Sequence, residues 1–249
     1  MIISNKRRPS IMDTDTILKT ARDLGADFVG IADLTPARDY LLREYNAFVA
    51  QFPRGIALGI GLMHSIVDRL PDAPHDPVIT KLYWHSAYEI VNARLDRMAN
   101  RLAGILQSAG YQGAPIPATV KVDNDELRGP FTHKLTAHLA GLGWIGKNCM
   151  LITPQAGPRV RWATVLTDMP LTPTGHAMSE RCGACDTCVR ICPVSAFSGR
   201  AFSADEPLDA RYNARACQAH LRTATICGLC LYACPYGRTS TITKLEQQS

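Results

Sequence analysis

The stretch Cys182-Gly-Ala-Cys185-Asp-Thr-Cys188-Val-Arg-Ile-Cys192-Pro193 contains three cysteines separated by two residues each, then a fourth cysteine directly before a proline. A second block, Cys227-Gly-Leu-Cys230-Leu-Tyr-Ala-Cys234-Pro235, ends in the same way and has a further cysteine, Cys217, upstream. This spacing is typical of loops whose thiolates bind a 4Fe-4S cluster. The two blocks together predict two such clusters.

The ligands can be divided between the two predicted clusters. A cubic cluster needs four soft sulfur donors, and a tight loop supplies only three of them. In proteins with two clusters, the cysteine before the proline binds the cluster of the other block. We therefore predict that one cluster is bound by Cys182, Cys185, Cys188 and Cys234, and the other by Cys192, Cys217, Cys227 and Cys230.

Zinc and disulfides are the alternatives for these cysteines. Pairs of the form Cys-x-x-Cys also bind zinc, but a zinc site requires neither a third cysteine at the same spacing nor a Cys-Pro ending in both blocks. Disulfide frameworks are typical of short secreted chains, whereas this chain has 249 residues and no visible export signal. Iron–sulfur clusters are the favoured interpretation.

The composition is that of a globular chain with a mildly basic balance. Hydrophobic residues make up 46%, charged residues 20%, and the formal net charge is +5, which permits an anionic ligand without requiring nucleic acid. No apolar run approaches the length of a membrane span. Lys6-Arg7-Arg8 is followed by polar and acidic residues rather than by a hydrophobic stretch, so we expect no membrane association and a cytoplasmic location.

The sequence predicts an α+β domain over residues 1–172, followed by a ferredoxin-like domain over residues 173–249 that carries both clusters. The boundary is placed at the proline-rich segment 170–175. Apolar periodicity and turn residues predict the following elements: strands at 27–33 and 55–63, a long helix over 78–109, a helix over 131–140, and a β-hairpin of 149–153 and 159–167 joined by the turn 154–158.

A glycine-rich segment, Gly141-Leu-Gly143-Trp144-Ile-Gly146-Lys147-Asn148, fits GxGxxG and nearly fits a phosphate-binding loop. Both motifs need a strand before the glycines and a helix after them, but here the expected order is reversed, which disfavours nucleotide binding. The glycines still allow the backbone to come close to a large flat ligand. Lys147 can contact a phosphate or amide there, Trp144 can cover an apolar ring edge, and we include Asn148 with them as candidate cofactor-binding residues.

The segment 140–154, its continuation to Leu166-Thr-Asp168, and the two cysteine blocks resemble epoxyqueuosine reductases. These are cobalamin-dependent iron–sulfur enzymes related to reductive dehalogenases. The resemblance covers most of residues 15–238 and is strongest from residue 131 onward. It implies that the first domain is a cobalamin-binding, α/β sandwich-like domain. Tyr83-Trp-His85-Ser-Ala-Tyr88 resembles the aromatic and histidine cluster of the family, so His85 is a candidate cofactor contact; the alternative is that it completes an aromatic core.

The resemblance also suggests catalytic candidates. The family has a catalytic acid in a Val-Asp motif before the glycine-rich turn, and Val122-Asp123 is similar to it, although the spacer to Gly141 is longer here. Asp125 and Glu126 are alternatives to Asp123. His133 and Lys134 are candidates for facing a cofactor or substrate, or else form a surface pair. The ninth cysteine, Cys149, is expected to be a buried small residue.

The predicted function is that of a reductase: two 4Fe-4S clusters pass electrons to a corrinoid, which reduces a small-molecule substrate. An external donor such as a ferredoxin or flavodoxin would supply the electrons. Epoxyqueuosine reductases continue into helical repeats that help to hold tRNA, whereas this sequence ends at Ser249, so we expect tRNA not to be a partner. The alternatives are an electron-transfer or corrinoid-reactivating protein, and a structural iron–sulfur module of a larger complex.

Overall fold

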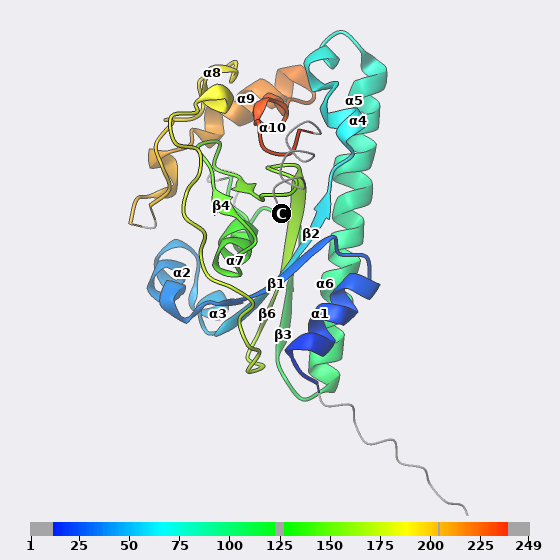
Figure 1. Ribbon diagram of the computed structural model, residues 1–249, viewed down its shortest axis with the longest axis vertical. Helices are drawn as coiled ribbons and strands as arrows, with labels where there is room; N and C mark the ends of the chain where they lie inside the picture. Colours follow the sequence, from blue (N-terminus) through cyan, green and yellow to red (C-terminus); the bar gives the residue numbers. More distant parts are fainter. Residues whose placement is uncertain (1–11, 123–126, 204, 239–249) are drawn as a thin grey trace, which may run out of the picture.

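The computed structural model describes residues 12–122, 127–203 and 205–238, and an antiparallel sheet lies at its centre (Figure 1). The sheet has four strands in the order β1-β2-β6-β3. Strand β2 pairs with β1 and β6, and β3 pairs with the other edge of β6. The strand bounds are β1 (Phe28–Asp33), β2 (Arg54–Gly61), β3 (Gly113–Ile116) and β6 (Val160–Thr167).

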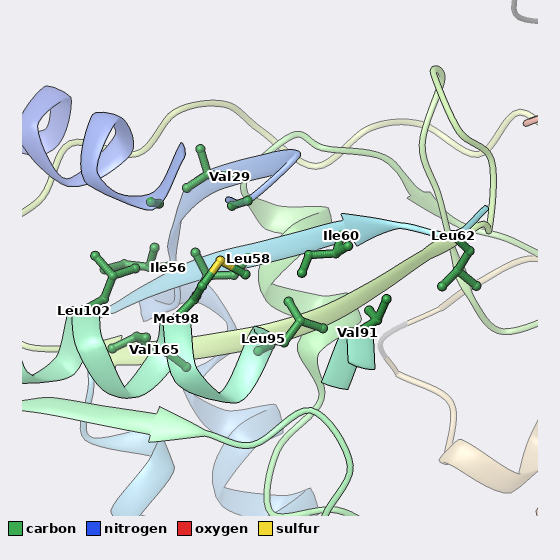
Figure 2. Close-up of a cluster of buried hydrophobic side chains, with 14 of the residues drawn as sticks. Val29, Ile56, Leu58, Ile60, Leu62, Val91, Leu95, Met98, Leu102 and Val165 are labelled. Carbon is green, nitrogen blue, oxygen red and sulfur yellow. The ribbon is translucent and has the colours of Figure 1, made fainter. Parts of the chain in front are cut away.

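Strand β2 is buried along six consecutive residues because helices cover both faces of the sheet. Its branched side chains pack against the long helix α6 (Val91–Ser108), as Figure 2 shows for Ile56, Leu58 and Ile60. Its glycines face the other side. A Cβ on Gly55 would lie 2.8 Å from Cγ2 of Thr136 in helix α7 (His133–Leu139), so the missing side chain allows that helix to come close.

Helix α1 (Thr14–Asp23) covers the same face as α6, and the short helices α2 (Arg38–Glu44) and α3 (Ala47–Ala50) lie on the side of α7 (Figure 1). The predicted long helix is confirmed, but it consists of α5 (Pro77–Tyr83), the π-helical segment η3 (Trp84–Ile90) and then α6. The i→i+5 hydrogen bonds of a short π-helical segment leave no signal of their own in the spacing of apolar residues, so the sequence pattern did not reveal it. Short helices η1 (Thr35–Ala37), α4 (His64–Val67) and η2 (Leu70–Asp72) fill the connections.

The predicted hairpin of residues 149–153 and 159–167 is wrong. Strand β5 (Leu151–Ile152) pairs instead with β4 (Trp144–Ile145), so the glycine-rich segment itself forms the hairpin, and β6 joins the central sheet. The turn 154–158 has a different role. A Cβ on Gly157 would lie 2.1 Å from the carbonyl oxygen of Tyr236, so this turn packs directly against the end of the second cysteine block.

The cysteine-bearing part of the chain has short helices separated by loops. Its helices are α8 (Thr187–Arg190), η4 (Leu208–Ala210), α9 (Ala214–Ala224) and α10 (Leu229–Ala233). Thr174, in the predicted boundary segment, accepts a hydrogen bond from the backbone N–H of Ile31 at 3.0 Å and donates to the carbonyl of Ala140 at 3.2 Å. These contacts fix the connecting segment to β1 and to the end of α7; the domain boundary at 170–175 stays a prediction. In the described part of the chain, no helix combines the length and apolar character that a bilayer crossing requires.

Candidate functional site

Four cysteines line one cavity of about 410 Å³. Three come from the first block, and the fourth, Cys234, comes from the end of the second block. The same cavity is also lined by residues of the glycine-rich hairpin and its neighbours, among them Lys147, Asn148, Ile152 and Tyr236. The cavity therefore brings together the four residues that were predicted to share one cluster, here called the first group: Cys182, Cys185, Cys188 and Cys234.

The remaining four predicted ligands form a second group: Cys192, Cys217, Cys227 and Cys230. Burial raises the pKa of Cys230 strongly, and the charges of Cys227, Cys217 and Cys192 raise it further. Helix α8, which carries Cys188 of the first group, contacts helix α10, which carries Cys230. The two groups are therefore neighbours, as electron transfer between two clusters would require.

Two thiols of the first group are far from ionising without a metal. Burial, together with the nearby thiols of the same group, raises the pKa of Cys188 to about 11 and that of Cys234 to about 12. Bound iron would offset this cost, because a coordinated thiol loses its proton. Among the described residues, no three His, Cys, Asp or Glu side chains converge as a single metal ion needs. Each thiolate of a cube binds a different iron, so eight soft donors in two open groups fit 4Fe-4S clusters better than zinc.

The glycine-rich segment contacts both groups. The ammonium of Lys147 donates to the carbonyl of Gly183 at 2.6 Å, inside the loop between Cys182 and Cys185. The amide of Asn148, which is 3% exposed, approaches the carbonyl of Cys230 at 3.5 Å. The buried guanidinium of Arg211 donates to the carbonyl of Gly146 at 2.9 Å. The segment is thus a bridge between the central sheet and the cysteine loops.

The glycines of this segment are explained by close approaches within the protein itself. A Cβ on Gly143 would lie 2.2 Å from the carbonyl oxygen of Ile152, and one on Gly146 would lie 2.7 Å from the side chain of Ile152. One on Gly141 would lie 3.1 Å from the carbonyl oxygen of His176. The close contact expected at this turn is therefore made with the protein's own chain, and a cofactor contact of the three glycines stays a prediction.

Two predicted cofactor residues lie in different surroundings from those expected. Trp144 is fully buried, and its ring meets that of Tyr236 edge-on at 4.8 Å between centroids, so burial does not favour contact with a large bound ring. The alternative that His85 completes an aromatic core is wrong: its side chain is 64% exposed and its Nδ1 lies 2.7 Å from Glu89. The role of His85 as a cofactor contact stays a prediction.

His133 and Lys134, predicted as catalytic candidates, are not a surface pair. Nε2 of His133 donates to the carbonyl of Pro117 at 3.1 Å, and its Nδ1 accepts from the hydroxyl of Thr164 at 3.0 Å. Burial lowers the pKa of His133 to about 4, so the ring is neutral at pH 7. The ammonium of Lys134 donates to the carbonyl of Cys149 at 2.9 Å, and burial lowers its pKa as well.

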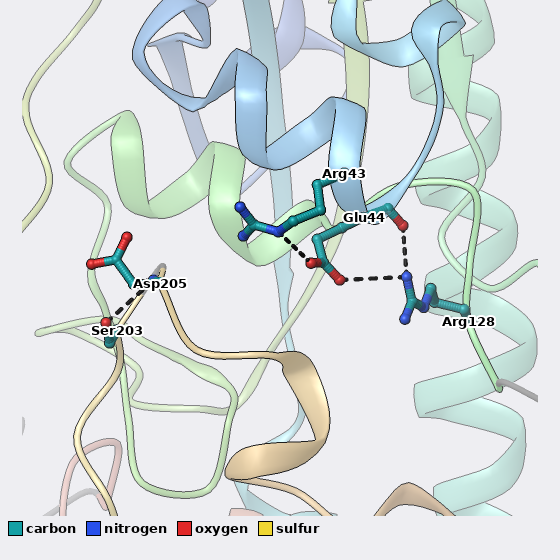
Figure 3. A network of polar contacts seen from close by, with 5 residues as sticks. All are labelled: Arg43, Glu44, Arg128, Ser203 and Asp205. Carbon is teal, nitrogen blue, oxygen red and sulfur yellow. Dashed lines mark hydrogen bonds and ion pairs between the residues drawn. The ribbon is translucent and has the colours of Figure 1, made fainter.

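Asp123, the third catalytic candidate, lies outside the described residues, as do Asp125 and Glu126. The chain that follows is held by Arg128, whose guanidinium donates to the carbonyl of Glu44 at 2.7 Å and lies 3.5 Å from its carboxylate (Figure 3). The anchor on α2 fixes where the segment re-enters the described structure. The catalytic role of Asp123 stays a prediction.

The structure adds residues that the sequence did not single out. Ile152 and Tyr236 line the first cavity. The side chain of Arg161 lies over the ring of Tyr88, 3.7 Å from its centroid. A charged residue inside the mostly apolar strand β6 was the available signal for Arg161, whereas Tyr236 and Ile152 resemble ordinary core residues in sequence.

The cysteine region and the overall fold both match known proteins. Residues 181–238 match the 4Fe-4S dicluster domain family. A reductive dehalogenase described for B12-dependent dehalogenation superimposes with a TM-score of 0.71 and 20% identity, over 98% of this chain and 35% of that chain. At this level of identity the likeness establishes the fold. The predicted α+β class with an iron–sulfur domain is confirmed, and the fold is similar to that of this dehalogenase.

Curated proteins that are similar in sequence to this chain include several epoxyqueuosine reductases. The chain is 35% identical to the one from Pseudomonas aeruginosa over 113 residues, which are 45% of this chain and 28% of that protein. It is 25% identical to the one from Cyclobacterium marinum over 206 residues, 74% of this chain and 63% of that protein. The resemblance predicted from sequence is therefore confirmed, although the matches span less than two thirds of either relative.

One solved epoxyqueuosine reductase contains a stem loop of tRNA-Tyr. It superimposes with a TM-score of 0.59 and 18% identity, over 90% of this chain and 65% of that chain. The comparisons thus give no support to the prediction that tRNA is excluded as a partner.

Two cysteine substitutions test the cluster assignment. We expect anaerobically reconstituted protein to bind about eight irons and about eight sulfides, because each cube takes four cysteines. Cys188→Ser should lose about half of the iron, since Cys188 lines the first cavity. Cys149→Ser is the matched control and should keep all of it, because Cys149 belongs to neither group. Zinc in place of iron, or only four irons in the unchanged protein, would contradict the assignment.

We expect His133 to make the protein less stable in mild acid. Its pKa falls from the usual 6.5 to about 4 on folding, so between these values the unfolded chain binds the proton and the free energy of unfolding decreases as the pH falls. The full effect is about 3 kcal/mol. Urea unfolding under anaerobic conditions at pH values of about 5 and about 7 should show a smaller difference for His133→Gln than for the unchanged protein. Equal differences would show that another group is responsible.

Proposed function

We propose that the chain is an iron–sulfur reductase in which two 4Fe-4S clusters pass electrons to a corrinoid that reduces a substrate. The observation that carries the proposal is the double contact of the glycine-rich segment, through Lys147 to the first cysteine group and through Asn148 to the second. Both groups are thereby fixed to the central sheet, in a chain whose fold is similar to that of a reductive dehalogenase described for B12-dependent dehalogenation. The epoxyqueuosine reductases among the relatives support the same class of reaction.

The residues around the second group fit a corrinoid. The Nε atom of Arg161 is buried and has no hydrogen-bond partner among the described residues, although its Nη1 lies 3.5 Å from Asn92. Its guanidinium covers Tyr88, which in turn stacks on Trp84 at 5.0 Å, and Trp84 is 46% exposed. A corrin offers amide oxygens to such a donor and an apolar rim to such rings.

The π-helical segment η3 carries both Trp84 and Tyr88, and its neighbour Tyr83 lies next to Cys230. Segments of π-helix occur often at functional sites. A ligand on this surface would therefore be near the second group, which is the arrangement that short-range electron transfer needs. When bound, the clusters would supply single electrons and the corrinoid a strongly reducing metal centre.

The chain can also supply a proton. Lys134 has a lowered pKa because of burial, which makes its ammonium a stronger acid than a surface lysine. Among the described residues, its ammonium donates one hydrogen bond, to the carbonyl of Cys149. That carbonyl is uncharged, so it does not balance the positive charge of Lys134. We propose Lys134 as the proton donor, with Asp123 as the second candidate. The electrons would come from an external ferredoxin or flavodoxin.

Cobalamin titration tests the proposal against the electron-transfer alternative. Reconstituted protein should change the absorption spectrum of added cobalamin and retain it on gel filtration. Arg161→Gln should weaken binding by about tenfold or more, because it removes a charged donor from the site. Arg94→Gln is the matched control: Arg94 is exposed on α6 and its hydrogen bond is to the carbonyl of Gly25. Full cluster content with no cobalamin bound would favour an electron-transfer protein instead.

The substrate class is a separate question. We propose a small molecule, because tight tRNA binding depends on many phosphate contacts and the net charge is only +5. A tRNA substrate is the second candidate, favoured by the stem loop bound to the related reductase. In a gel-shift assay with tRNA-Tyr we expect weak binding that is lost at about 0.15 M salt. A tight complex that persists there would establish tRNA as a partner.

A further inference from the structure

The two cysteine groups differ in how far the rest of the chain covers them. In the loop that begins the second block, a Cβ on Gly228 would lie 2.8 Å from the side chain of Leu70 and 3.5 Å from the hydroxyl of Tyr83, so this loop packs against η2 and α5. In the loop that begins the first block, a Cβ on Gly183 would meet no atom of the described residues within 4 Å, and Gly183 and Ala184 are both exposed. Helix α8 of the first block accordingly lies at the outer edge of the molecule, whereas α10 of the second block lies further in (Figure 1). An external protein can therefore approach the first group through its exposed loop.

Two cations lie beside this exposed loop. Lys147 and Arg181 both line the cavity of the first group, and no carboxylate of the described residues lines it with them. The ammonium of Lys147 donates to the carbonyl of Gly183 at 2.6 Å, and the guanidinium of Arg181 lies over the ring of Trp144, 5.7 Å from its centroid. A carbonyl and an aromatic ring are uncharged, so neither cation has an ion-pair partner in the described part of the chain.

The acidic residues that flank the loop have partners of their own. The carboxylate of Glu180 accepts a hydrogen bond from the backbone N–H of Cys182 at 2.6 Å. The carboxylate of Asp186 lies 3.1 Å from the guanidinium of Arg190. Residues 210–238, which contain the whole second block, include no aspartate or glutamate. The surface around the loop is therefore positively charged without a compensating carboxylate at the cavity.

This combination of exposure and charge is what a docking surface for an electron carrier requires. A carrier has to bring its own redox group close to the cluster that it reduces, so it must dock where a cluster lies near the protein surface. Exposed charges of one sign attract an oppositely charged protein and orient it during the encounter. The exposed loop of the first group meets the first requirement, and the two cations beside it meet the second for an acidic carrier.

We propose that the surface formed by Lys147, Arg181 and the exposed residues 183–184 docks a small acidic electron-carrier protein of the flavodoxin type, which reduces the first cluster. The inference rests on the proposed pair of clusters and gives the external electron donor a binding site. In each encounter the reduced flavin of the carrier loses one electron and the first cluster gains it, and no covalent bond is made or broken. The electron then passes to the neighbouring second cluster.

Stopped-flow mixing of reconstituted protein with reduced flavodoxin tests this surface. We expect the second-order rate constant of cluster reduction to fall as salt is raised from about 0.05 M to about 0.3 M, because salt screens the attraction between exposed charges. At the lower salt, Arg181→Glu should reduce the rate constant by about tenfold or more, since it reverses a charge that steers the carrier. Arg101→Glu is the matched control and should leave the rate constant unchanged. It makes the same change in net charge at an exposed arginine without an ion pair in the described part of the chain, but Arg101 lies on α6.

A small uncharged reductant separates docking from an effect on the cluster itself. We expect Arg181→Glu to bind full iron and to be reduced by photoreduced deazariboflavin at the rate of the unchanged protein. Equal slowing with flavodoxin and with deazariboflavin would show that Arg181 acts on the cluster, and would overturn the docking surface. If Arg181→Glu does not bind the first cluster, cross-linking of the unchanged protein decides.

Carbodiimide cross-linking joins a lysine ammonium to a carboxylate and so locates the docked flavodoxin. We expect the unchanged protein to cross-link through Lys147, and not through Lys19 on α1 or Lys81 on α5, which are both exposed. Cross-links only at other lysines, or a reduction rate that responds neither to salt nor to Arg181→Glu, would overturn the inference and leave the reductase proposal intact. Failure of the unchanged protein to bind about eight irons would instead contradict the proposed function.

Discussion

The structure depends on how many cysteines a single loop can supply. A tight cysteine loop can present only three thiols to a cubic iron–sulfur cluster, so the fourth must come from another part of the chain. Here Cys234 joins Cys182, Cys185 and Cys188 around one cavity. The two cysteine blocks therefore lie on the same cavity, independently of any bound metal. The turn 154–158 completes the arrangement, since its backbone meets that of residues 236–237 at distances that exclude a Cβ on Gly157 or Gly237. The C-terminal block is thus positioned by Cys234 at the cavity and by the close backbone contact at Gly157 and Gly237.

The sequence predicted the features that follow from regular spacing. The central strands and the long helix were recognisable because runs such as Ile56-Ala-Leu58 are apolar, and the grouping of the cysteines followed from the Cys-Pro endings. The hairpin was misassigned because Pro154 and Pro158 bracket a turn that looks like a hairpin connection, while β4 is only two residues long. Pairing of β4 with β5 depends on packing of Gly143 against Ile152, which no local pattern encodes.

The candidate site was less predictable than the cluster ligands, since burial determines what its polar residues can do. His133 and Lys134 are adjacent in sequence, and both have their pKa lowered by burial. For the imidazole, which already titrates near neutrality, the shift removes the charge at pH 7. For the ammonium, which titrates far above neutrality, it increases acidity. The sequence indicated two candidates of equal standing, whereas burial leaves the imidazole of His133 neutral at pH 7 and makes the ammonium of Lys134 a stronger acid.

The late position of Cys234 has a consequence for biosynthesis. A ribosome releases residues 182–188 well before residue 234, so three cysteines of the first group are exposed while the fourth is still missing. Iron delivered at that stage would meet an incomplete site open to water and oxygen. The docking surface for the missing ligand, the turn 154–158, has by then already been made. The order of residues along the chain therefore favours a maturation sequence in which the sheet folds first, the C-terminal block docks second, and metal is inserted last.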